Sequence, residues 1–113
     1  MTDKLEMLDA LIAVIERTQR RMQTATFARG LREGGRAERD TAAIAMLETT
    51  LARSALMNAA IEEVAAGLAA NSDAIEAGIV DLDKALADLK RIKPILDGIT
   101  ALLGLVKRII TVV

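Results

Sequence analysis

Residues 61–113 read IEEVAAGLAANSDAIEAGIVDLDKALADLKRIKPILDGITALLGLVKRIITVV. Large aliphatic residues recur in this stretch at every seventh position without a polar interruption. A seven-residue repeat keeps these side chains on one side of a helix and is typical of helices that pack as coiled coils. The stretch therefore predicts helices, and it predicts an interface with a second copy or a helical protein partner along the repeat: Ile61, Leu68, Ile75, Leu82, Leu89, Leu96, Leu103 and Ile110.

Two interruptions divide this stretch. The run NSD at 71–73 favours turns and helix caps, and its Asp73 has the capping-box spacing to Glu76. Pro94 lacks an amide hydrogen, so it either kinks a helix or starts a new one. The alternative is that the last two or three helices fuse into one rod. We expect separate helices over residues 73–92 and 95–111.

The N-terminal residues predict a long first helix. Thr2 can accept a hydrogen bond from a free first-turn amide, and Asp3 adds negative charge near the positive end of the helix dipole. Large apolar residues then recur at three- and four-residue steps as far as Met22. We expect this helix over residues 2–28.

Glycine residues mark the next segment as a loop. Gly30, Gly34 and Gly35 lie close together beside charged residues, and glycine weakens both helix and strand. We expect a basic, glycine-rich loop over residues 29–40. A helix over residues 41–70 should follow, capped by Asp40 or Thr41. Its apolar stripe consists of Ile44, Leu47, Leu51, Ile61, Val64 and Leu68.

These segments predict an all-α protein. The 113 residues, 52% hydrophobic and 27% charged, fit one globular domain rather than a disordered chain. We expect a single helical domain over residues 1–113, built as an antiparallel helical hairpin or bundle of three to four helices with coiled-coil-like packing. A second copy is expected to complete it as a homo-oligomer.

The composition argues against catalysis. The chain has no His and no Cys, so it lacks the usual zinc and haem ligands, the commonest general base and the thiol nucleophile. The acidic pairs Glu62–Glu63 and Asp81–Asp83 would not converge on one ion, because residues one or two apart on a helix point in different directions. We expect no enzyme activity, no catalytic or metal-binding residue, no cofactor and no small-molecule substrate.

Charge alternates in blocks along the chain, acidic at 1–16 and 54–88 and basic at 17–39 and 89–113. Arginine forks suit phosphate oxygens, so the block at 17–39 suggests electrostatic binding of nucleic acid. The alternative, which we favour, is that these residues pair with an acidic block of a neighbouring helix or subunit. Nucleic acid is therefore an unlikely partner for the seven arginines of this block: Arg17, Arg20, Arg21, Arg29, Arg32, Arg36 and Arg39.

Residues 95–113 form a wide apolar arc with a small basic polar side. Such a helix can lie in a membrane interface, although no Trp or Phe anchor is present. It can equally be buried in a bundle, which we favour. The stretch is too short and too often interrupted by charge to span a membrane.

The sequence thus predicts a non-catalytic helical structural or assembly protein that binds itself or a protein partner. A membrane-surface protein that uses residues 95–113 is the first alternative, and nucleic-acid binding through residues 17–39 is the second. Without a signal peptide in the sequence, we expect a cytoplasmic protein, either free or peripheral to a membrane.

Overall fold

The computed structural model describes residues 4–110, and within this range the chain is all-helical and compact. Thr2 and Asp3, expected to start the first helix, lie outside the described residues. So do the last three residues of the stretch 95–113, for which burial was expected and a membrane-facing position was the alternative. Six helices are present in the described part of the chain: α1 (Lys4–Met22), α2 (Ala25–Glu33), α3 (Arg36–Asn58), α4 (Ile61–Ala70), α5 (Ser72–Leu86) and α6 (Ile92–Ile109).

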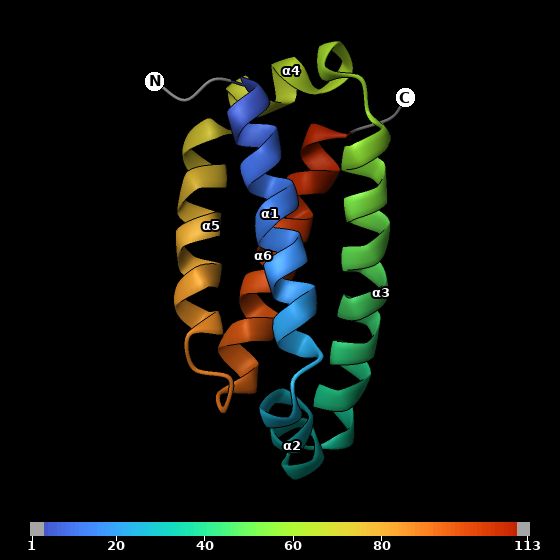
Figure 1. Cartoon of the computed structure of the whole chain (residues 1–113), viewed down its shortest axis with the longest axis vertical. Helices are drawn as coiled ribbons and strands as arrows, with labels where there is room; N and C mark the ends of the chain where they lie inside the picture. Colours follow the sequence, from blue (N-terminus) through green and yellow to red (C-terminus); the bar gives the residue numbers. More distant parts are fainter. Residues whose placement is uncertain (1–3, 111–113) are drawn as a thin grey trace.

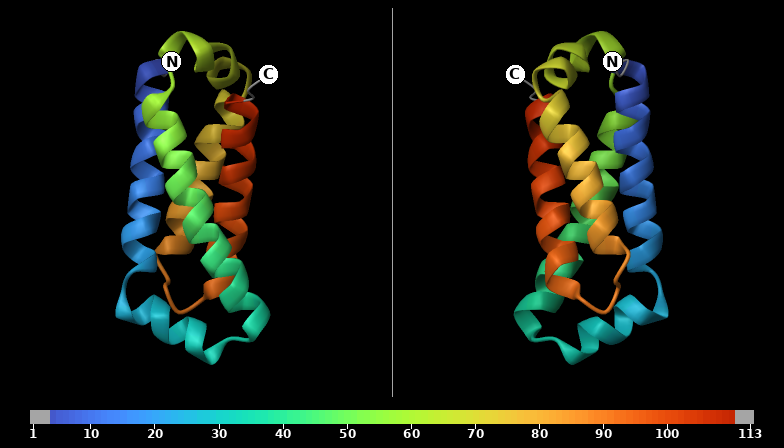
Figure 2. Two further views of the ribbon diagram at one scale, coloured as in Figure 1. Left: turned by 90° about the vertical axis from the view of Figure 1, so that its right-hand side faces the viewer. Right: turned by 90° about the vertical axis from the view of Figure 1, so that its left-hand side faces the viewer.

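Four long helices lie side by side, and the two short ones cross the ends (Figure 1). α1 and α5 run in one direction, and α3 and α6 run in the other. α3 and α5 each contact both α1 and α6, so the four form a ring in which α3 and α5 stand opposite each other. α2 crosses the end where α1 leaves off and α3 begins, and α4 crosses the opposite end from α3 to α5 (Figure 2).

The first helix is shorter than expected, because Thr24 starts a new one. Thr24 has an extended backbone, and its hydroxyl accepts a hydrogen bond from the Phe27 amide at 3.3 Å. The same hydroxyl donates to the Arg21 carbonyl at 2.7 Å and so joins the end of α1 to the start of α2. Phe27, the only aromatic residue, is fully buried and fixes α2 against the core. The expected helix over residues 2–28 is therefore wrong at its C-terminal end.

The expected glycine-rich loop over residues 29–40 is also wrong, because most of it is helical. Only Gly34 and Gly35 separate α2 from α3, and both have extended backbones with negative φ. Gly30 lies inside α2, where a methyl group would come within 2.8 Å of Ile92 Cδ1. Its role is close helix packing rather than a turn.

The expected helix over residues 41–70 is divided at Ala59 and Ala60. Both have extended backbones, with ψ of 136° and 140°. Alanine is the best helix former, so local preference does not explain the break. Packing does, because the turn lets Val64 and Leu68 of α4 bury themselves over the end of the bundle.

The two C-terminal helices pack side by side in opposite directions, so the alternative of a single rod is wrong. α5 ends at Leu86 rather than at 92, and α6 begins at Ile92 rather than at 95. Pro94 sits in the first turn of α6, where a missing amide hydrogen costs no intrahelical bond.

Candidate protein-interaction surface

The eight residues of the heptad repeat line the chain's own core. Five are buried in the described structure, and the other three are half-buried and pack against the core. They come from α4, α5, α6, the turn before α6 and the residue directly after α6, so the repeat continues across helices that reverse direction. Within one copy these side chains therefore pack in or against the core, and the expected interface with a partner along the repeat stays a prediction. The buried members are Leu68, Ile75, Leu82, Leu96 and Leu103, and the half-buried ones are Ile61, Leu89 and Ile110.

α6 supplies the largest share of this core. Its apolar arc faces the other helices, which places the wide apolar side of residues 95–109 inside the molecule rather than on a membrane-facing surface. None of the helices within residues 4–110 is both long and apolar enough to cross a membrane. The buried residues of α6 are Ile92, Ile95, Leu96, Ile99, Leu102, Leu103, Leu105, Val106 and Ile109.

The apolar stripe expected on residues 41–70 lies partly on the outside. Ala42, Ala45, Thr49 and Leu56 are the buried residues of α3, and their mostly small side chains let the helix approach its neighbours closely. The larger residues at the start of the stripe point the other way. The left view of Figure 2, with α3 in front, looks onto the side of α3 that faces away from the other helices of the ring.

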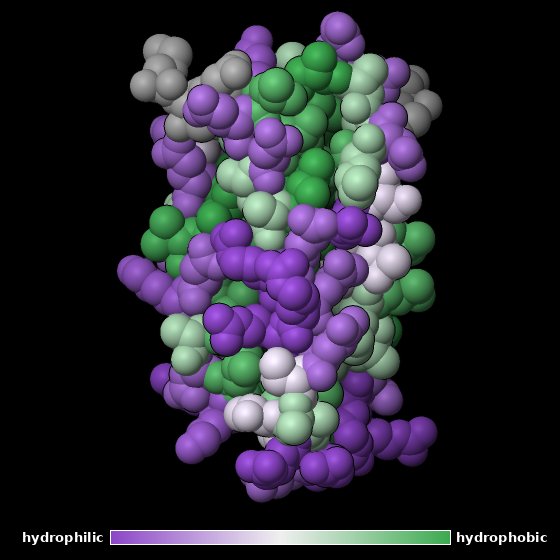
Figure 3. All heavy atoms as spheres, viewed as in Figure 1, coloured by the Kyte–Doolittle hydropathy of each residue, from purple (hydrophilic) through white to green (hydrophobic). Residues whose placement is uncertain are grey.

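Large exposed apolar side chains are concentrated on α3. Of the seven in the described residues, five belong to this helix. Ile44, Leu47 and Leu51 expose 57%, 61% and 60% of their surface and follow one another at steps of three and four, which puts them on one side of the helix. With Ala55, one turn further on, they form what we call the α3 face. Figure 3 shows hydrophobic side chains projecting from the edge that α3 forms.

This face carries no free charge. Residues 42–58 contain only two ionisable side chains, Glu48 and Arg53. Glu48 pairs with Lys107 Nζ of α6 at 3.5 Å, and Arg53 pairs with Glu16 of α1 at 2.8 Å. Exposed helix faces normally carry charged residues, so about four turns of uncharged surface are unusual for a face in water.

A groove runs beside the α3 face, between α3 and α6. The Glu48–Lys107 ion pair crosses it, with a hollow of about 340 Å³ on one side and one of about 390 Å³ on the other. Ile44 and Leu51 line one hollow each. The groove is open because small residues line it, above all Gly104, which has no atom within 4 Å of the position of a Cβ.

The arginine block divides into paired and free side chains. Arg17 makes two hydrogen bonds to the carboxylate of Asp83 on α5, at 3.0 and 3.2 Å, as expected for pairing with an acidic block. Arg36 lies 3.9 Å from Asp40 within α3, and Arg39 donates to the Gly34 carbonyl at 2.7 Å. The other four are exposed and come from the end of α1 and from α2: Arg20, Arg21, Arg29 and Arg32.

The fold collects the basic blocks at one end. α2, the start of α3 and the start of α6 meet there, and the nine cations at this end outnumber the five acidic residues Glu33, Glu38, Asp40, Asp88 and Asp97. We call this the basic end. It comprises Arg20, Arg21, Arg29, Arg32, Arg36, Arg39, Lys90, Arg91 and Lys93.

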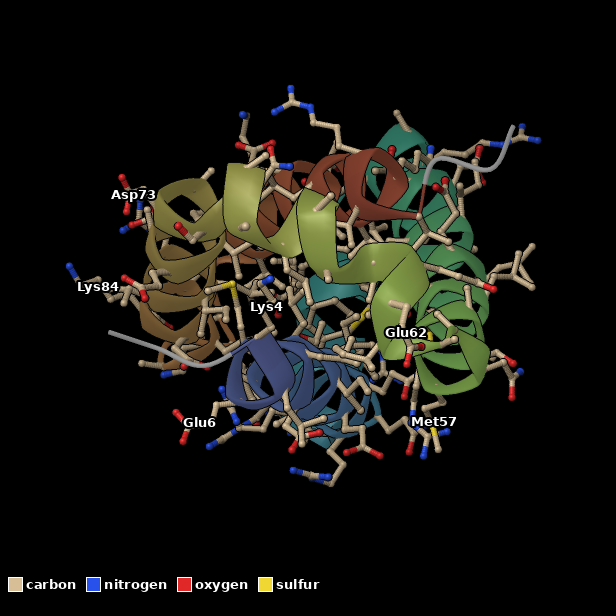
Figure 4. The ribbon with its side chains drawn as sticks, turned by 90° about the horizontal axis from the view of Figure 1, so that it is seen from above. Lys4, Glu6, Met57, Glu62, Asp73 and Lys84 are labelled. Atoms are coloured by element: carbon tan, nitrogen blue, oxygen red, sulfur yellow. The ribbon has the colours of Figure 1, made fainter. Side chains whose placement is uncertain are left out.

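The opposite end is acidic. α4, the start of α1 and the start of α5 meet there, and Figure 4 looks down on this end. Within residues 4–110, five exposed acidic residues outnumber the three cations of this end, which are Lys4, Lys107 and Arg108. We call this the acidic end. Its acidic residues are Glu6, Glu62, Glu63, Asp73 and Glu76.

The acidic pairs form no metal site in the described part of the chain. Glu62 and Glu63 are exposed on α4, and Asp83 is occupied by Arg17 while Asp81 is exposed on α5. No group of three or more acidic side chains within residues 4–110 is arranged to hold a metal ion.

No protein-family model, no curated protein and no solved structure matches the chain.

Proposed function

We propose that the protein is a non-catalytic assembly protein that associates with itself through the α3 face. The observation that carries this proposal is the uncharged, outward side of α3, where three large aliphatic side chains are each more than half exposed. Contiguous apolar patches on a soluble domain mark surfaces that bind proteins. The groove beside the patch offers further apolar contact to whatever docks there.

Light scattering across a dilution series tests the proposal. We expect the mass to rise from 12.1 kDa toward twice that value as the protein concentration increases. The rise should occur between about 1 and 100 μM, the range of moderate self-association. A chain that stays monomeric at about 100 μM contradicts the proposal.

A pair of variants assigns the association to α3. Leu51→Glu places a charge on the α3 face and should weaken the dimer at least about tenfold, because that charge would lose its water on association. Val80→Glu is the matched control, since Val80 is 50% exposed but lies on α5, opposite α3 in the ring. Equal effects of the two substitutions would place the interface elsewhere.

A further inference from the structure

Resting on the proposed function, we propose that the two copies pack antiparallel along α3, with the basic end of each copy beside the acidic end of the other. The α3 face can be covered by a second copy in either of two directions. The two differ in which ends of the molecule become neighbours, and the charge of those ends decides between them.

The charged ends favour the antiparallel arrangement. The molecule is 44 Å long, and the basic and acidic ends lie at opposite ends of this axis. A parallel pair would put the nine cations of one basic end beside those of the other, and the acidic ends together as well. Like charges repel and opposite charges attract over about 10 Å at moderate salt, so only the antiparallel pair gains from its ends.

The α3 face is itself compatible with this direction. Ile44, Leu47 and Leu51 repeat at steps of three and four, and the same steps continue to Asp40 in one direction and to Ser54 and Asn58 in the other. Pairing two such helices antiparallel about the midpoint between Leu47 and Leu51 brings Leu47 beside the partner's Leu51. The charged residues of α3 nearest this midpoint are Glu48 and Arg53, and each is already paired within its own copy, with Lys107 and Glu16.

The same register also predicts which residues of the two copies face each other near the ends of α3, and this pairing can be measured. It puts Asp40 of one copy opposite the partner's Asn58. The two positions are 18 residues apart on α3, which corresponds to about 27 Å along the helix axis. A parallel pair would instead put Asp40 beside the partner's Asp40 and Asn58 beside the partner's Asn58.

Site-directed disulfide formation distinguishes the two arrangements, because the chain contains no Cys of its own. Asp40→Cys and Asn58→Cys are made as separate single variants of the full chain, and both positions are exposed. Each variant is oxidised mildly alone, and then the two are oxidised as a mixture. A disulfide forms only when the two Cα atoms come within about 7 Å.

We expect the mixture to give a disulfide that joins an Asp40→Cys chain to an Asn58→Cys chain, at a yield at least about tenfold above that of either variant alone. Val80→Cys, on α5, is the control for random collision. Disulfides formed by each variant alone, or a dimeric mixture with no mixed disulfide, would overturn the antiparallel arrangement. Light scattering on the same reduced samples, with and without Leu51→Glu, separates this failure from that of the proposed function. The proposed function fails if the samples are monomeric, or if Leu51→Glu weakens the dimer no more than Val80→Glu does.

Discussion

Gly67 and Gly104 both lie in helices, but the space around the two residues differs. A Cβ on Gly67 would lie 2.9 Å from the Cα and 3.1 Å from the carbonyl oxygen of Ile109. These are backbone atoms of another helix, so no side-chain rotation can relieve the contact. A Cβ on Gly104 would meet no atom within 4 Å.

Replacing each glycine by alanine should therefore change stability in opposite directions. Gly67→Ala is expected to lower the free energy of unfolding by about 1 to 3 kcal/mol, because α4 and α6 must move apart. Gly104→Ala is expected to raise it by about 0.5 to 1 kcal/mol, because alanine favours the helix and nothing opposes it. Urea denaturation at low protein concentration measures both, and a loss of stability in Gly104→Ala would contradict the open groove.

Single residues also show what the sequence could predict. The heptad repeat predicted an interface with a second copy or a helical partner, whereas its residues pack in or against the core of one copy. Large aliphatic residues at regular helical steps pack inward in most helices, and the repeat does not show which helix they will meet. The same reasoning missed the outward position of Ile44, Leu47 and Leu51. The sequence does show that residues 42–58 contain only two charged side chains, Glu48 and Arg53. Only the structure shows that Lys107 and Glu16 pair with them.

Helix ends were predictable where a residue enforces them. A turn was expected at residues 71–73 and lies at Asn71, but α5 begins at Ser72, so Asp73 is not its cap. The Asn71 side chain caps no amide of α5 and instead donates to the Gly67 carbonyl at 2.8 Å. Pro94 stands in the first turn of α6. The break at Ala59 and Ala60 was not predictable, because both residues favour helix and the turn arises from packing of α4 on the bundle end. Gly30 was expected to lie in a loop, but it lies inside α2, where its lack of a side chain allows close packing against Ile92.

A proline substitution tests this hidden break. Ala60 has φ of −71°, and Ala59 before it has φ of −73° and ψ of 136°, a backbone that proline and its preceding residue accept. Ala60→Pro should leave stability unchanged or raise it by up to about 1 kcal/mol, because proline restricts the unfolded chain.

Ala77→Pro is the control, since Ala77 is also exposed but lies inside α5. It should cost about 3 kcal/mol or more, because proline removes a hydrogen bond and clashes with the preceding turn. Thermal melting followed by circular dichroism measures both variants. Equal destabilisation would mean that α3 and α4 form one continuous helix.

At the scale of the whole molecule, helical periodicity predicted an all-α protein, and the structure of residues 4–110 confirms this fold class. The separation of charge between the two ends of the molecule was not predictable from the alternating acidic and basic blocks of the sequence. Blocks of the same sign come together at one end only because successive helices run in opposite directions. The same holds for the groove, which depends on which helix α3 meets. Sequence periodicity predicts which side of a single helix is buried. It does not predict which two helices become neighbours, and the groove lies between two helices, α3 and α6.

The central claim is that a second copy covers the α3 face, and hydroxyl-radical footprinting of the unmodified chain tests it most directly. The measurement compares the oxidation rate of each side chain at about 1 μM and about 100 μM protein, below and above the expected association range. Leu47 and Leu51 should lose at least about threefold in rate at the higher concentration, because the partner excludes water from them. Val80, which is 50% exposed on α5, should keep its rate. Unchanged rates at Leu47 and Leu51, with Val80 as the reference, would contradict the account.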